Sequence, residues 1–135
     1  MNFDEFTGQV QHRLELPGTG EAVRATRATL TTLGERIQEG EASDLAASLP
    51  MEVDYYLTGA VADHGQRFNW SEFVTRVRER EGMADPDDGA DAAYHARVVL
   101  DVVAESVAPA ELRQVRDQLP ADEGWESLFE LVDAD

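Results

Sequence analysis

The chain repeats itself once, and this duplication limits the folds that it can adopt. Residues 2–6 read NFDEF and residues 69–73 read NWSEF. Six residues of the first copy also return as identical or similar residues: Arg27, Leu30, Ile37, Glu41, Leu49 and Pro50 match Arg97, Leu100, Val107, Glu111, Leu119 and Pro120. The first segment matches at an offset of 67 and these six at 70, so the second copy carries three extra residues. Such a repeat predicts two copies of one structural unit that bury their apolar faces together.

The hydrophobic period within each copy is that of an α-helix. Apolar or small residues recur at steps of three and four, at Val23, Thr26, Leu30, Leu33 and Ile37 and at Ala93, Ala96, Leu100, Val103 and Val107. This spacing predicts a buried stripe on a helix of about four or five turns. We expect Thr19 to cap the first long helix and Gly40 to end it. The acidic segment 85–89 is expected to cap the second.

Shorter helices are expected before and after each long one. One begins near Phe3 in the first copy and near Trp70 in the second. A third helix follows in each copy, with Pro109 in its first turn in copy two, and a short fourth helix is expected over 51–57 and 125–132. No segment alternates apolar and polar residues as a strand would. The chain is therefore predicted to be all-α, with about eight helices as two pseudo-symmetric four-helix repeats packed around one core.

The length of 135 residues fits one helical domain over 1–135. We place repeat one at 2–57, the connector at 58–68 and repeat two at 69–132. Each repeat has roughly sixty residues, which is marginal for independent folding. The connector contains Ala60, Val61 and Phe68, which favours repeats that dock over repeats on a flexible linker.

The charge of the chain is strongly negative. Twenty-eight acidic residues stand against eleven basic ones, all of them arginine, for a net charge of −17. Such a surface repels itself at ordinary ionic strength, and molar salt shortens the screening length to about 3 Å. Because the acidic residues are spread along the whole chain, we favour adaptation to concentrated salt over a surface for a basic partner. Nucleic acid is disfavoured as a partner because no stretch offers a basic face.

The sequence also bears on location and redox chemistry. No apolar run approaches the length of a membrane span, and residues 1–6 lack the basic and apolar regions of a signal peptide. We therefore expect a soluble cytoplasmic protein without a membrane partner. The absence of cysteine excludes disulfides and thiolate metal sites.

Several segments carry a family resemblance. Residues 24–30 read RATRATL, 33–37 read LGERI, 40–50 read GEASDLAASLP, 104–112 read AESVAPAEL and 118–120 read QLP. Together they resemble the domain-of-unknown-function family 2267, whose members are similar duplicated helical proteins. The acidic, lysine-free composition resembles a haloarchaeal-type member. The resemblance implies a small, soluble, all-helical protein, and it brings no reaction, cofactor or catalytic residue.

Arginines recur at matched positions of the two copies. Arg13 matches Arg80, and Arg27 matches Arg97. One interpretation is a clamp for an anion or for a partner's carboxylate between the copies, since guanidinium binds such groups bidentately. The other interpretation is structural, with ion pairs to glutamates that are repeated as well, namely Glu5, Glu72, Glu41 and Glu111. We favour the structural interpretation.

No catalytic or cofactor site can be assembled from the sequence. Asp91 and His95 lie four residues apart on one helix face, which permits a metal contact, but a helix cap and a surface histidine explain both. Residues 85–91 resemble a calcium loop, yet the glycine falls one place early and the bidentate glutamate is missing. Neither a nucleophile elbow nor a phosphate-binding glycine loop occurs. We therefore predict no cofactor and no metal.

These observations favour a non-enzymatic domain that binds another protein or itself, in the groove between the copies. The alternative is a small-ligand-binding protein or an enzyme that uses arginines and carboxylates of that groove. The direction of the four arginines separates the two. Convergence on an open cavity favours a ligand, and a carboxylate beside each arginine disfavours it.

Overall fold

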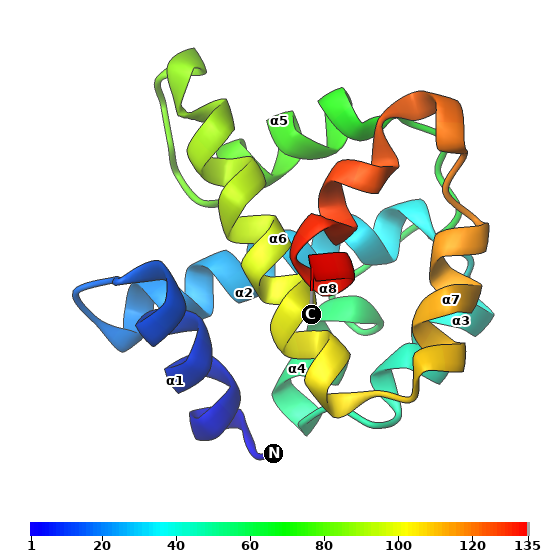
Figure 1. Ribbon diagram of the computed structural model, residues 1–135, viewed down its shortest axis with the longest axis horizontal. Helices are drawn as coiled ribbons and strands as arrows, with labels where there is room; N and C mark the ends of the chain where they lie inside the picture. Colours follow the sequence, from blue (N-terminus) through cyan, green and yellow to red (C-terminus); the bar gives the residue numbers. More distant parts are fainter. Residues whose placement is uncertain (135) are drawn as a thin grey trace.

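The computed structural model describes residues 1–134, and within them the chain forms eight α-helices and no strand (Figure 1). The helices are α1 (Phe3–Leu14), α2 (Thr19–Arg36), α3 (Glu39–Ala46), α4 (Met51–Leu57), α5 (Trp70–Arg80), α6 (Gly89–Ser106), α7 (Pro109–Asp117) and α8 (Glu130–Ala134). Three short 3-10 helices add to these, η1 (Pro86–Asp88), η2 (Ala121–Glu123) and η3 (Trp125–Phe129). The all-α prediction is confirmed.

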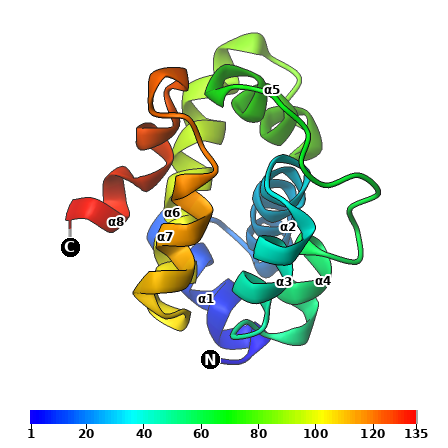
Figure 2. The same ribbon diagram turned by 90° about the vertical axis from the view of Figure 1, so that its right-hand side faces the viewer.

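The two long helices, α2 and α6, pack against each other, and the other helices are arranged around them. The short helices α1 and α5 each contact both long helices. On the outside, α4 packs on α2, while η3 and α8 pack on α6. The pair α3 and α7 lie side by side (Figure 2). Segments distant in sequence are therefore joined mainly through contacts with the two long helices.

One cluster of buried apolar residues draws on both long helices. Leu30 of α2 and Leu100 of α6 are both fully buried, as the helical stripe predicts. Phe6 of α1 and Phe73 of α5 are fully buried in the same cluster. Each such side chain contributes about 2 kcal/mol through its removal from water. The same cluster thus holds α1, α2, α5 and α6 together.

The helices α1 and α5 begin in the same way. The side-chain oxygen of Asn2 accepts a hydrogen bond from the backbone N–H of Glu5 at 2.8 Å, and that of Asn69 accepts one from Glu72 at 2.9 Å. A carboxylate oxygen of Glu5 in turn accepts a hydrogen bond from the backbone N–H of Asn2, which completes a capping box. The recurring asparagine is thus explained by the needs of a helix N-terminus, and the glutamate completes the cap only at α1.

The predicted ends of α2 are wrong. Thr19 is the first residue of the helix, and Gly18 occupies the cap position without a side-chain hydrogen bond. The helix ends at Arg36 because Ile37 is extended, with φ −91° and ψ 162°, and its side chain stays fully buried in the core. Gly40 is the second residue of α3 and ends nothing. The chain therefore turns between α2 and α3 at a buried isoleucine and not at a glycine.

The start of α6 and the last helix also differ from expectation. Asp85 caps η1, where it accepts a hydrogen bond from the backbone N–H of Asp87 at 2.9 Å, and Asp88 precedes α6 without a side-chain cap. The segment expected as one helix over 125–132 is divided into η3 and α8. Pro109 does lie in the first turn of α7, as predicted.

Candidate functional site

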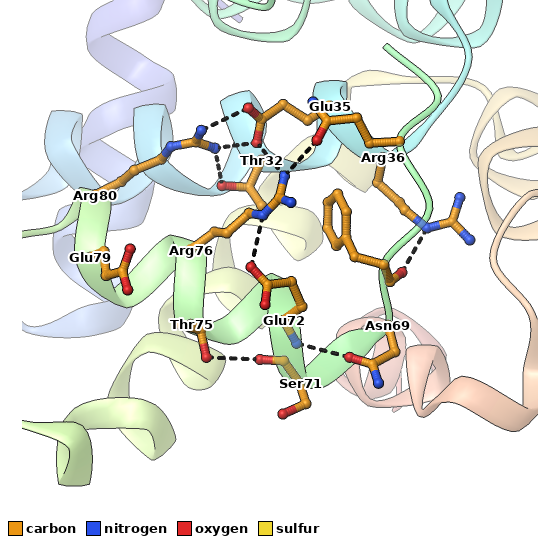
Figure 3. A network of polar contacts seen from close by, with 12 residues as sticks. Thr32, Glu35, Arg36, Asn69, Ser71, Glu72, Thr75, Arg76, Glu79 and Arg80 are labelled. Carbon is orange, nitrogen blue, oxygen red and sulfur yellow. Dashed lines mark hydrogen bonds and ion pairs between the residues drawn. The ribbon is translucent and has the colours of Figure 1, made fainter. Parts of the chain in front are cut away.

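A network of charged side chains joins α5 to the end of α2 (Figure 3). Arg80 donates from Nη1 and Nη2 to the two carboxylate oxygens of Glu35, at 2.6 and 2.8 Å, and also from Nη1 to Thr32 Oγ1 at 2.8 Å. Arg76 Nη1 adds a hydrogen bond of 3.2 Å to Glu35. Burial raises the pKa of Glu35, but the hydrogen bonds and charges of Arg80 and Arg76 outweigh it and hold this pKa below its ordinary value. The carboxylate is thus kept ionised between the two helices.

A second set of ion pairs joins α1 to the end of α6. Arg13 Nη1 donates to Asp101 Oδ2 at 2.8 Å, and its Nη2 donates to the carboxylate of Glu105. The side chain of Asp101 is 15% exposed and that of Glu105 is 44% exposed. The arginine of α1 therefore binds α6 near the C-terminal end of that helix, just as the arginine of α5 binds α2.

The other two matched arginines, Arg97 and Arg27, differ from each other in their contacts and exposure. Arg97 Nε donates to the backbone carbonyl of Ser127 at 2.8 Å and lies 3.5 Å from a carboxylate oxygen of Glu130. Arg27 is exposed on α2. Burial raises the pKa of Tyr56, and the positive charge of Arg27 partly offsets that rise. Arg13 thus contacts carboxylates of α6, Arg80 contacts Glu35 and Thr32 of α2, and Arg97 contacts Ser127 and Glu130.

The expected partners of Arg13 and Arg80 are wrong. Glu5 caps α1, and Glu72 pairs with Arg76 at 3.0 Å. The reason is geometric, because eight residues of α-helix separate each first-turn glutamate from the matched arginine, which is a rise of about 12 Å. The arginines in the last turns instead reach carboxylates on another helix.

A cleft of about 840 Å³ lies between α1, α6 and α8. Its walls include Arg13 and Asp101, which are already paired, together with partly buried Leu16 and Leu131. Tyr94 of α6 also lines it and is 46% exposed. The cleft therefore combines an exposed aromatic ring and apolar surface with polar groups that are held in place.

A smaller cleft of about 370 Å³ lies where the end of α2 approaches the connector and the end of α7. Its walls contain two arginines, Arg36 and Arg67. Sequence reasoning missed both, because it selected residues that recur in the two copies, and the position matched to Arg36 is Ser106. The one available signal was an arginine placed directly before Ile37 at the end of the buried stripe.

Of the two residues considered for metal binding, His95 contacts another side chain and Asp91 does not share that contact. His95 Nδ1 lies 2.7 Å from a carboxylate oxygen of Glu81, which is a buried residue, whereas Asp91 is exposed. In the part of the chain that the structure describes, no group of three or more histidine or acidic residues is placed to hold a metal ion. The acidic segment after Met83 forms η1 and the start of α6.

The chain matches a sequence family over most of its length. The family is described as "Uncharacterized conserved protein (DUF2267)", and the match covers residues 3–125. The chain belongs to this family. No curated protein matches it. The DUF2267 match spans α1 to α7 and reaches Trp125, so it includes the arginines of both clefts, while α8 lies beyond it. Over residues 1–134, no helix of this DUF2267 protein combines the length and apolar character that a membrane crossing requires.

Proposed function

We propose that this DUF2267 protein is a non-enzymatic binding domain whose partner, another protein or a second copy of the chain, docks in the cleft between α1 and α6. The observation that carries the proposal is the exposure of Tyr94 on the wall of a cleft of about 840 Å³. Exposed aromatic side chains in concave surfaces are frequent anchors of protein interfaces. Leu16 and Leu131 add apolar surface beside the ring.

The charges of the cleft support a protein partner over a small charged ligand. Arg13 is paired with both Asp101 and Glu105, so its positive charge is already balanced. These ion pairs also hold α1 against α6 and fix the two walls relative to each other. A partner that fills the cleft with apolar surface would leave them intact, whereas an anionic ligand would compete with two carboxylates.

A pair of tyrosine variants tests this site. Tyr94→Glu places a charge in the cleft, and Tyr55→Glu is the control, because Tyr55 is 57% exposed on α4 and outside the cleft. Purified wild type and variants are compared by sedimentation for self-association and by capture from a high-salt lysate, followed by reconstitution with the purified partner. We expect binding by the wild type and by Tyr55→Glu, and loss with Tyr94→Glu. Equal behaviour of the two variants would contradict the site.

We further propose that residues 2–57 and 69–132 are two repeats of one single domain, related by an approximate two-fold axis. Two observations support this. The helices α2 and α6 begin and end at positions 70 residues apart, and α1 contacts α6 as α5 contacts α2. An experimental structure in which the two segments fail to superimpose would contradict it. Each repeat expressed alone should remain unfolded, since it would expose one face of its long helix.

We also propose that the protein works in the cytoplasm of a salt-accumulating cell. The net charge of −17 supports this, because self-repulsion destabilises the folded state until salt screens it. We expect the melting temperature to rise from low to molar KCl. A melting temperature that does not depend on KCl would contradict salt adaptation.

A further inference from the structure

The smaller cleft is built on a connector that is fastened to the end of α2. Three groups of the connector donate hydrogen bonds to backbone carbonyls at this end of the helix. His64 Nδ1 donates to Gly34 at 2.7 Å. The backbone N–H of Gly65 donates to Ile37 and that of Gln66 donates to Glu35, both at 2.8 Å. The last carbonyls of an α-helix have no partner within the helix, so these bonds satisfy them. Arg67 follows directly and is therefore carried by an anchored segment.

Arg36 lines the smaller cleft and is held in a fixed orientation there. It is the last residue of α2 and only 5% exposed. Its Nε donates to the carbonyl of Phe68 at 2.9 Å, and its guanidinium carbon lies 5.5 Å from the ring centre of Trp125. Figure 3 shows its two Nη nitrogens turned away from the Glu35 network. One edge of the guanidinium is thus used for structure, and the other edge remains to bind a ligand.

The positive charges of this cleft are not balanced by ion pairs. Neither Arg36 nor Arg67 forms an ion pair with any acidic residue of 1–134, although six other arginines of this range do. Burial lowers the pKa of Arg36, the charge of Glu123 raises it and the charge of Arg67 lowers it further. A buried cation without an ion-pair partner is costly in a folded protein. An anion bound between the two arginines would remove that cost.

The other walls of the smaller cleft add a hydrogen-bond donor from Gln118 and a carboxylate acceptor from Asp117. Gln118 Oε1 accepts a hydrogen bond of 2.8 Å from the backbone N–H of Gln38, so the amide nitrogen of Gln118 is left as the donor at its free end. Asp117 is exposed on the same wall, and Pro120 closes the end of the cleft. The volume of about 370 Å³ is within the range of small-molecule sites.

We propose that this cleft binds the carboxylate of a small organic acid, with Arg36 and Arg67 as its cationic contacts. A planar carboxylate matches the two Nη donors of a fixed guanidinium. A phosphate dianion fits less well, because Asp117 lines the cleft and Glu123 lies near enough to act on Arg36 electrostatically. The site uses neither Tyr94 nor Arg13, so the test of this proposal is independent of the cleft between α1 and α6.

The test is a titration of the intact chain followed by ¹H–¹⁵N NMR, with potassium acetate and potassium phosphate as separate probes at constant ionic strength. The reporters are the Nε–H of Arg36 and the indole N–H of Trp125. Arg67→Gln is the main variant, since Arg67 is exposed and its loss leaves the fold intact. The matched control is Arg24→Gln, an exposed arginine of α2 outside the cleft. Asp117→Asn removes the negative wall.

We expect acetate to cause saturable shifts at both reporters. Arg67→Gln should weaken acetate binding roughly fivefold, as expected for the loss of an exposed charge, and Arg24→Gln should leave it unchanged. Asp117→Asn should strengthen it. The proposal is overturned if acetate causes no saturable shift at Arg36, if the two arginine variants behave alike, or if phosphate binds more tightly than acetate.

Discussion

Arg80 of α5 donates two hydrogen bonds, 2.6 and 2.8 Å long, to the two carboxylate oxygens of Glu35 on α2. Arg13 of α1 makes the corresponding contact with Glu105, which lies 70 residues after Glu35 on α6. The surroundings differ, since the side chain of Glu35 is 15% exposed and that of Glu105 is 44% exposed. Matched positions in the sequence thus carry ion pairs with unequal shielding from water.

This difference predicts unequal costs for removing the two carboxylates. Glu35→Gln should lower the free energy of unfolding by about 2 kcal/mol, because it removes the shielded negative charge and replaces the oxygen that accepts from Arg80 Nη2 with an amide donor. Glu105→Gln should cost less than about 1 kcal/mol, as is usual for an exposed pair. Urea unfolding at fixed KCl measures both values. Equal costs would show that shielding does not set the strength of these pairs.

The lowered pKa of Glu35 predicts a loss of stability in acid. Its pKa in the folded state lies below the ordinary value of 4.5, so the unfolded chain takes up this proton more readily than the folded one. The stabilisation is therefore complete above about pH 4.5 and is lost as the pH falls through the folded-state pKa. The stability difference between wild type and Glu35→Gln should shrink below about pH 4.5 in thermal melts. A difference independent of pH would contradict this origin.

The helices were predictable because their signals are local. The stripes through Leu30 and Leu100 depend on residues three or four positions apart. The ion pairs were not predictable, because Arg13 and Glu105 are 92 residues apart and meet only when α1 packs on α6. A residue pattern within one helix contains no information about which carboxylate on another helix lies closest.

The smaller cleft was missed for a related reason. Comparison of the two proposed repeats favours residues that occur in both, which are mainly those for helix starts and packing. Arg36 has no matching arginine 70 residues later, where Ser106 stands, and its surroundings come from residues 58–68 and from the end of α7. A feature formed by residues without a match in the other half of the sequence can be found only once the fold is known.

The shared core predicts similar costs for truncating its two matched leucines. Leu30 and Leu100 are both fully buried, so Leu30→Ala and Leu100→Ala should each lower the free energy of unfolding by roughly 2–5 kcal/mol. Met51→Ala is the control, because Met51 is 81% exposed and its truncation should change stability by less than about 0.5 kcal/mol. Denaturant unfolding checks all three. A cost near zero at either leucine would contradict its place in the core.

Substitution by alanine should have opposite effects on stability at two helical glycines, Gly34 and Gly40. A Cβ at Gly34 of α2 would lie 2.4 Å from the backbone oxygen of Leu57 and 2.8 Å from the side chain of Val61, so α4 could not keep its present distance. Gly34→Ala should therefore cost about 1–3 kcal/mol. Gly40 lies within α3 with no atom within 4 Å of its Cβ position, and Gly40→Ala should stabilise the protein by roughly 0.5–1 kcal/mol, since alanine favours helix. Thermal melts of the two variants at the same KCl concentration provide the comparison. Stabilisation by Gly34→Ala would mean that α4 does not pack this closely on α2.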